Sequence, residues 1–357
     1  MARHLVCLTL DFDALSIWIR RGQTTPTALS RGEFGVVGAE RILDLLRNQR
    51  IRATWFVPGH TLDTYPEMCR RIHAEGHEIA HHGYLHEPPA TLSRDEEERV
   101  LVRGLEAIER VTGAAARGYR SPAWDLSAHT IRLLLAHGFI YDSSMMAHDH
   151  LPYRARDGDQ VGADGAVRWG RTTTLIEMPV AWSLDDYPHF ERATGPSGLQ
   201  PGLMHAAGVL GNWVDDFRYM SRSAEWGVLT YTFHPQVSGR GHRMLTLERL
   251  IDATRDLGAT FVRMDEAADE FAARDRGRGD AGASRRLVPS GGDAGAGLGR
   301  EPKRRISRAS AGGGAAPGRA PNAARAGASA LGRPAAGRRN APAKARPGRL
   351  GKRRTAR

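Results

Sequence analysis

Short apolar runs alternate with segments of helical periodicity along most of the chain. Runs typical of buried strands lie at 5–10, 53–57, 78–82, 119–124, 139–142, 175–182, 228–234 and 260–263. Apolar residues recur at helical spacing at 37–47, 66–74, 94–112, 128–137, 204–219, 247–257 and 265–271. Strands that alternate with helices in this way predict an α/β fold with a parallel sheet. About seven such units suit a closed or nearly closed (β/α) barrel.

Charge divides the 357-residue chain into two parts. The whole chain has 51 Lys and Arg against 40 Asp and Glu, a net charge of +11. Residues 276–357 hold 21 basic and 3 acidic residues, which leaves 30 basic and 37 acidic residues, a net charge of −7, in residues 1–275. The second part lacks Phe, Trp and Tyr, so it cannot bury enough apolar surface to offset the entropy of ordering. We expect one large domain in residues 1–275, followed by a disordered basic tail in residues 276–357.

Cysteine content and hydropathy exclude other classes. The two cysteines, Cys7 and Cys69, cannot form a disulfide framework, which fits a reducing compartment. No apolar run reaches the roughly 18–20 residues of a membrane span. The apolar run at 5–10 is too short for the core of a secretory signal. The sequence therefore favours a cytoplasmic protein without a membrane span.

Polar residues suited to catalysis gather where the predicted strands end. They are Asp11, Asp13, His81, His82, Arg120 and His234. Barrels of this class place their active sites at the carboxyl ends of the strands, so we predict one shared site there. Residues 147–173, rich in Gly and Asp, predict a long irregular insertion near this site.

Asp11 and Asp13 close the first predicted strand. Strand alternation places both carboxylates on one side, about 7 Å apart at their Cα atoms. Two acids on one face are costly unless a cation or hydrogen-bond donors neutralise them. The alternative is a pair of solvated loop carboxylates.

His82-Gly-Tyr-Leu-His86 is the second cluster, and Gly83 with the following prolines predicts a strand that runs into a loop. Two imidazoles four residues apart can converge on one metal, and a carboxylate can supply a third ligand. The pair alone is a weak signal because the chain has 15 histidines. The neighbouring His73, His77 and His81 are more typical of surface or core-edge residues than of ligands.

Four stretches, in this order and spacing, resemble the polysaccharide deacetylases, the NodB-homology domains of carbohydrate esterase family 4. They are Leu8-Thr-Leu-Asp-Phe-Asp13, His82-Gly-Tyr-Leu-His86, Arg120-Ser-Pro-Ala-Trp124 and Thr232-Phe-His234. Other stretches are most similar to the cytoplasmic peptidoglycan-deacetylase-like and allantoinase-like branch, among them Ala53-Thr-Trp-Phe-Val-Pro-Gly-His60, Tyr141-Asp-Ser-Ser-Met145 and Pro179-Val-Ala-Trp-Ser-Leu-Asp-Asp186. The resemblance runs from about Leu5 to Phe271. It implies a distorted (β/α) barrel, a bound divalent metal, usually zinc, and hydrolysis of a non-peptide C–N bond.

The resemblance also implies a role for each matching residue. The metal ligands are Asp13, His82 and His86. Asp11 matches the catalytic base, Arg120 the arginine that orients the base, and His234 the general acid. Trp124 and Trp182 line the substrate pocket. Asp185 and Asp186 either bind substrate or support the site, and the alternative for them is a solvated turn before Pro188.

Two departures from the family pattern concern the substrate. A phenylalanine separates Asp11 from Asp13, where the usual motif has adjacent aspartates, and Thr232 replaces the usual leucine before His234. The first expectation remains N-deacetylation of an acetylated amino sugar or polysaccharide. The second is hydrolysis of small cyclic amides or imides, as in the allantoinase-like relatives. A third hypothesis, from a different functional class, is a protein without catalytic activity whose barrel is inert and whose tail binds a polyanion.

The remaining expectations concern partners. The branch resemblance implies a homo-oligomer. Clusters such as Lys303-Arg-Arg305 and Lys352-Arg-Arg354 suit weak, sequence-independent binding of the tail to nucleic acid or another polyanion. The tail has no aromatic residues to stack on bases, so base-specific recognition is not expected.

Overall fold

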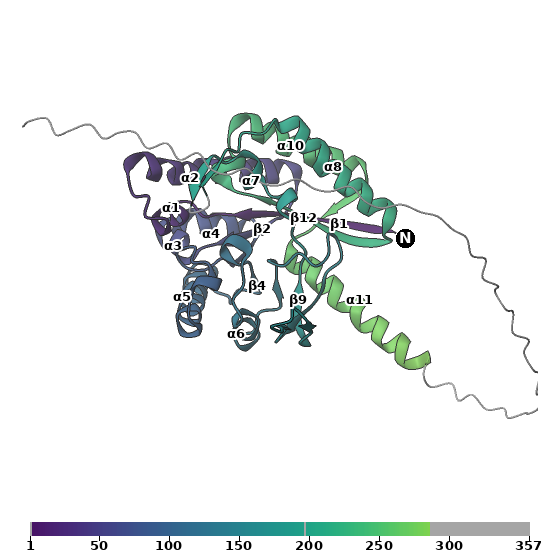
Figure 1. The fold of residues 1–357 in the computed structure, drawn as a ribbon. Helices are drawn as coiled ribbons and strands as arrows, with labels where there is room; N and C mark the ends of the chain where they lie inside the picture. Colours follow the sequence, from purple (N-terminus) through teal and green to yellow (C-terminus); the bar gives the residue numbers. More distant parts are fainter. Residues whose placement is uncertain (1, 196–197, 286–357) are drawn as a thin grey trace, which may run out of the picture. The chain divides into compact units, whose positions relative to one another are not determined.

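The computed structural model describes residues 2–195 and 198–285 (Figure 1). Residues 286–357, which include most of the predicted basic tail and its lysine and arginine clusters, lie outside the described residues. In the part of the chain that the structure describes, no helix is both long and apolar enough to cross a lipid bilayer.

One large sheet carries the fold. Its strands are β1 (Arg3–Asp11), β2 (Thr54–Val57), β3 (Glu78–His81), β4 (Gly118–Tyr119), β5 (Tyr141–Asp142), β6 (Tyr153–Asp157), β9 (Arg171–Glu177), β12 (Trp226–Phe233) and β13 (Ala259–Phe261). They pair in the order β12-β1-β2-β3-β4-β5-β9-β6, and β13 pairs with the first half of β1. All of these pairs are parallel except β6 with β9.

The sheet curls into an open half-barrel. Within the described residues no pairing joins β12 to β6, so the two ends of the sheet stay apart. Seven parallel strands follow one another along the path from β12 to β9, which confirms the predicted distorted (β/α) barrel of about seven units.

Helices connect the strands of the sheet, and a last helix follows β13. They are α1 (Ser16–Arg20), α2 (Pro26–Gln49), α3 (Gly59–Thr64), α4 (Pro66–Ala74), α5 (Arg94–Thr112), α6 (Thr130–Ala136), α7 (Asp186–Phe190), α8 (Ala206–Ser223), α9 (Pro235–Ser238), α10 (Gly241–Asp256) and α11 (Met264–Arg285). The helices α8 and α10 lie side by side, and α8 packs on β12 (Figure 1). Short 3-10 turns lie at Pro89–Thr91, Pro122–Trp124 and Trp182–Leu184.

Local sequence signals set several helix ends. The side chain of Ser93 accepts a hydrogen bond from the Glu96 amide, and the Glu96 carboxylate accepts one from the Ser93 amide, so a capping box starts α5. The helix stops at Gly113, whose φ of 72° is favourable only without a side chain.

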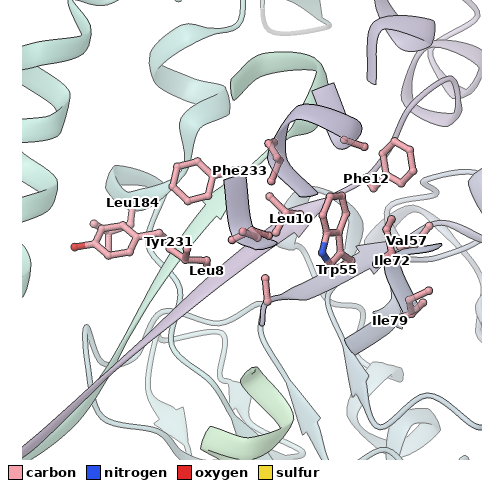
Figure 2. Close-up of a cluster of buried hydrophobic side chains, with 14 of the residues drawn as sticks. Leu8, Leu10, Phe12, Trp55, Val57, Ile72, Ile79, Leu184, Tyr231 and Phe233 are labelled. Carbon is pink, nitrogen blue, oxygen red and sulfur yellow. The ribbon is translucent and has the colours of Figure 1, made fainter. Parts of the chain in front are cut away.

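The alternation of β1 divides the core into two layers. Val6, Leu8, Leu10 and Phe12 point outward into a cluster formed with the surrounding helices. Figure 2 shows part of this cluster around Trp55 and Phe233. Leu5 and Cys7 point into the curl of the sheet. The residues that continue this inward series are Thr9, Asp11 and Asp13, so alternation delivers polar groups to the carboxyl end of the same interior.

Helix α11 fills the opposite end of the interior and extends further than expected. Met264, Ala267 and Ala268 are fully buried there beside Leu5 and Cys7. The expected last helix ended at Phe271 and the expected tail began at residue 276, but α11 runs to Arg285. The domain boundary at residue 275 stays a prediction. A helix nucleated by its buried first turns continues through residues whose composition alone predicts disorder.

Residues 147–173 also differ from expectation. They form β6, which pairs with the edge strand β9, and a small hairpin of β7 (Gln160–Val161) and β8 (Val167–Arg168). No residue of this segment lines the catalytic cavity described below. The segment covers a sheet edge that would otherwise present unpaired backbone groups.

Candidate active site

Asp13 lies directly after β1 with both carboxylate oxygens buried and unsatisfied. Its side chain is 0% exposed, and neither Oδ1 nor Oδ2 accepts a hydrogen bond from the described residues. The Oδ1 atom is 3.5 Å from Nε2 of His82 and 3.8 Å from Nε2 of His86. Burial without a donor raises the pKa of Asp13. These positions exclude the alternative of two solvated loop carboxylates.

His82 follows β3, and its ring orientation is fixed. Its Nδ1 lies 2.8 Å from the carbonyl oxygen of Arg120, and because a carbonyl can only accept, Nδ1 carries the proton. In this tautomer the lone pair is on Nε2, the atom that faces Asp13. A histidine that donates its second nitrogen to a carbonyl is the usual arrangement of a metal ligand.

His86 reaches the same point from the loop after β3. Burial, followed by the influence of His82, holds the pKa of His86 well below its usual range, so its ring is neutral. One donor atom each from Asp13, His82 and His86 lies within 4.8 Å of the others. Two imidazoles and one carboxylate form a donor set suited to a divalent cation, and the unsatisfied oxygens of Asp13 fit such an occupant.

Asp11, at the end of β1, is held by Arg120. Nη1 of Arg120 donates to Oδ1 of Asp11 at 2.7 Å, and the arginine is 0% exposed. Burial alone would raise the pKa of Asp11, but the charge of Arg120 outweighs it and lowers that pKa below its usual value. Asp11 is therefore ionised at neutral pH.

Arg120 is in turn fixed by three further contacts. Nη1 also donates to Oγ1 of Thr9 at 2.9 Å, Nε donates to the carbonyl oxygen of Ser143 at 3.1 Å, and Nη2 donates to Oγ of Ser143 at 3.0 Å. Its guanidinium carbon lies 4.0 Å from the ring centroid of Phe56. Thr9 could have been found from sequence, because it precedes Asp11 by two residues on the same strand face. Ser143 carried no such signal.

A buried carboxyl pair supports the loop that holds Arg120. Oε1 of Glu177 accepts hydrogen bonds from the amides of Ser144 and Met145, both at 2.8 Å, and Oγ of Ser144 donates to Oδ1 of Asp142 at 2.7 Å. Burial raises the pKa of Asp142 to about 6. Burial, together with the charge of Asp142, raises the pKa of Glu177 well above its usual value.

Replacing Glu177 with glutamine should make stability less sensitive to alkali. A carboxyl with a raised pKa stabilises the folded state fully below its unfolded pKa, and that contribution is lost as pH rises through the folded pKa. Between pH 5 and pH 8, the wild-type protein should lose about 1–3 kcal/mol more unfolding free energy than Glu177→Gln. Urea unfolding at both pH values measures the difference, with Glu40→Gln on the exposed side of α2 as control. Equal losses in wild type and Glu177→Gln would contradict the prediction.

His234 directly follows β12 and faces the second carboxylate oxygen of Asp13. Its Nε2 is 3.8 Å from Oδ2 of Asp13, and its Nδ1 donates to Oδ1 of Asp186 at 2.8 Å. Burial alone would lower the pKa of His234, but Asp185 and the hydrogen bond to Asp186 raise it well above its usual value. The ring is therefore protonated at neutral pH.

The aspartate pair is buried, which excludes the solvated turn. Asp186 is 0% exposed, also accepts hydrogen bonds from the His234 amide and from Ser238, and does not line the cavity. Of the two roles expected for Asp186, its contact with His234 favours support of the site over substrate binding. Asp185 does line the cavity and accepts a hydrogen bond from the Tyr187 amide at 2.9 Å. Burial raises the pKa of Asp185 to about 8.

Five of these groups line one cavity of about 450 Å³, namely Asp11, His82, His86, Asp185 and His234. Trp124 and Trp182 form one wall, with ring centroids 4.3 Å apart and planes inclined by 23°. Trp124 is buried and Trp182 is half exposed at the mouth. The cavity also has lining residues that no sequence motif indicated, namely Ile17, Arg21, Tyr187 and Gln200.

Backbone strain is concentrated around this cavity. Six non-glycine residues have a positive φ in the described ranges, and four of them adjoin the site: Ala14, His86, Ala123 and Trp124. Each such backbone conformation lowers the stability of the folded state by about 1–3 kcal/mol, and it persists only where the surrounding structure holds the residue in it. The strand predicted over 119–124 is therefore shorter than expected. Its extended part ends with β4, and residues 122–124, two of which have a positive φ, form a 3-10 turn.

The curled α/β half-barrel and its donor set of two histidines and one aspartate define the class of protein. Residues 34–141 match the sequence model of the polysaccharide deacetylases. The chain is 36% identical over 285 residues to the peptidoglycan deacetylase of Helicobacter pylori, covering 76% of this chain and 97% of the relative. It is 30% identical over 296 residues to a peptidoglycan deacetylase-like protein of Gibberella zeae, covering 75% of this chain and 86% of the relative. The chain therefore belongs to the polysaccharide deacetylase family, which confirms the resemblance drawn from its motifs.

Solved structures agree with this assignment. A Mycobacterium smegmatis structure assigned to the polysaccharide deacetylases is 33% identical, with a TM-score of 0.67 over 77% of this chain and 92% of that one. The PuuE allantoinase has a TM-score of 0.63 at 20% identity, over 76% of this chain and 91% of that one, which shows a shared fold alone.

Proposed function

We propose that this protein is a metal-dependent hydrolase that removes the N-acetyl group from an acetylated amino sugar or polysaccharide. The observation that carries the proposal is the buried, unsatisfied carboxylate of Asp13 facing the lone pairs of His82 and His86. The names of the relatives support deacetylation of a sugar polymer as the reaction class.

The proposed ligands of the metal are Asp13, His82 and His86. Two imidazoles and a carboxylate suit zinc, and a divalent cation held there would polarise an amide carbonyl and make water acidic enough to ionise near neutral pH. The protein contributes a fixed donor set, because the His82 tautomer is set by the Arg120 carbonyl.

Asp11 and His234 divide the proton transfers. Asp11 is ionised and held by Arg120, so it can accept a proton from the attacking water. His234 is protonated and held by Asp186, so it can donate a proton to the leaving amine. The amine must be protonated as it leaves, because an amide anion is a very poor leaving group. The protonated imidazole of His234 is suited to donate that proton. Trp124 and Trp182 offer apolar faces on which a sugar ring can stack.

Acetate release tests the function directly. Purified protein would be incubated with N-acetylglucosamine oligosaccharides, peptidoglycan fragments and cyclic ureides such as allantoin, with zinc and with a chelator. We expect acetate from an acetylated sugar, loss of that activity on chelation and recovery with added metal. Ring opening without acetate release would favour the cyclic-amide alternative. No reaction in any arm would favour the inert barrel.

His234→Ala should slow catalysis without releasing the metal. The proposed role of His234 is proton donation, which contributes about 10²–10⁴-fold, so kcat should fall within that range. Metal content should stay near one equivalent, as measured by elemental analysis. His242→Ala, at an exposed position on α10, is the matched control and should behave as wild type. Metal loss in His234→Ala would instead make His234 a ligand.

A further inference from the structure

Arg21 is the permanent cation of the catalytic cavity. Among the described residues that line the cavity, it is the one arginine, and none of them is lysine. Its backbone is anchored to the site, because Ser16 at the start of α1 donates through Oγ to the Asp13 carbonyl at 2.7 Å, and the Arg21 amide donates to the Ile17 carbonyl at 3.3 Å. The backbone of Arg21 is therefore held in place near the proposed metal ligand Asp13.

The side chain of Arg21 lies on the His234 side of the cavity. Nη1 donates to the hydroxyl of Tyr187 at 2.8 Å, and the guanidinium carbon is 5.8 Å from the Tyr187 ring centroid. The ring centroids of Tyr187 and His234 are 5.1 Å apart. Tyr187 thus lies between Arg21 and the proposed proton donor of the leaving amine.

No carboxylate of the described residues lies within 4.0 Å of Arg21. The contrast with Arg31 is informative, because both arginines lie against Trp18 and Arg31 pairs with Glu191. The two carboxylates that line the cavity have other partners. Asp11 accepts from Arg120, and Asp185 accepts from the Tyr187 amide.

The chemistry of the Arg21 guanidinium indicates which group on a substrate it would bind. An arginine has five N–H donors in a planar fork that matches a carboxylate, and Tyr187 accepts from one of its nitrogens. An exposed arginine inside a substrate cavity, without a protein carboxylate beside it, is suited to an anionic group on the substrate. Its place on the His234 side assigns that group to the amine-bearing half of the substrate, not to the acetyl half.

We propose that Arg21 binds a carboxylate on the amino-sugar half of the substrate, so that the enzyme prefers acidic N-acetyl amino sugars over neutral ones. This inference rests on the proposed deacetylation, because His234 defines which side receives the amine. An amino sugar that carries its carboxylate on an ether side chain has the required chemistry.

Two matched probes isolate the charge. Both are oligosaccharides that contain N-acetylmuramic acid, one with the free lactyl carboxylate and one with that group converted to its carboxamide. For wild type, kcat/KM should be higher for the carboxylate probe. Arg21→Ala should reduce the ratio of carboxylate to carboxamide kcat/KM by about 10- to 100-fold, the value of one charge-assisted contact. The change should appear in KM, because Arg21 does not touch the reacting bond.

Two further variants control for charge and position. Arg21→Lys keeps the cation and should recover part of the ratio. Arg20→Ala removes the adjacent exposed arginine, which does not line the cavity, and should keep the wild-type ratio. An unchanged ratio in Arg21→Ala would overturn the proposal, as would an equal fall in Arg20→Ala.

Binding without turnover separates this inference from the proposed function. Calorimetry would compare wild type and Arg21→Ala with the deacetylated probe that carries the carboxylate and with its carboxamide. Tighter binding of the carboxylate that depends on Arg21 would support the inference even if neither acetylated probe is hydrolysed, an outcome that would reject deacetylation of these sugars. Hydrolysis of both probes with binding independent of Arg21 would leave the function standing and overturn the anion site.

Discussion

His82→Ala is expected to lose both metal and activity. Its Nε2 lies 3.5 Å from Asp13, and its side chain is almost fully buried, so no water-exposed group can replace it. Loss of one of three protein ligands should weaken metal binding by at least about 100-fold. Loss of the cation removes several kcal/mol of transition-state stabilisation, so kcat/KM should fall by about 10³-fold or more.

Elemental analysis and acetate release measure the two effects in the same preparations. His73→Ala is the matched control, because His73 is exposed on α4 and lies outside the donor cluster. His82→Gln, which keeps a polar side chain of similar size, guards against loss of folding, and thermal unfolding checks each variant. Full metal occupancy in both His82 variants would show that the ligand assignment is wrong.

Asp11→Asn should abolish turnover and keep the metal, whereas Asp13→Asn should lose the metal. Asp11 is held by Arg120 through Oδ1, and its proposed role is to accept a proton. An amide cannot accept that proton, so kcat should fall by about 10²–10⁴-fold. Asp13 has two unsatisfied oxygens beside His82 and His86, so its replacement removes the anionic ligand of the cluster.

The same two measurements separate these carboxylates. Metal content should remain near one equivalent in Asp11→Asn and drop in Asp13→Asn. The comparison is matched, because both changes remove one charge, keep the side-chain size and lie two residues apart on one strand face. Equal metal loss in the two variants would contradict the division of roles between Asp11 and Asp13.

Part of the fold and the site follows from local sequence patterns. The alternation along β1 predicted that Asp11 and Asp13 share a face, and the structure continues that series from Leu5 through Cys7 and Thr9. The helix predicted over 94–112 is α5, and its ends follow from local sequence because the capping box at Ser93 and the stop at Gly113 depend on contacts within one or two turns. Family motifs indicated the donor set, and the structure brings Asp13, His82 and His86 together.

Local composition did not indicate every helix and strand that the structure contains. The stretch from 276 to 285 reads as disordered by itself, yet it belongs to α11, whose first turns are buried inside the sheet. The segment 147–173 reads as an irregular insertion, yet β6 pairs with β9. In residues 147–173 a pairing partner distant in sequence decides the structure, and no local pattern records it.

The sequence by itself determined the βα alternation, the face on which the two acids lie and the identity of the metal-binding and catalytic candidates. These properties depend on strand and helix periods and on short motifs. Only the tertiary structure decided that Asp186 supports His234, that Asp185 is buried in the cavity and that Arg21 meets Tyr187 there. Parallel strand pairing brings loops that are more than 150 residues apart in the chain to one end of the sheet, and only that convergence determines which side chains meet.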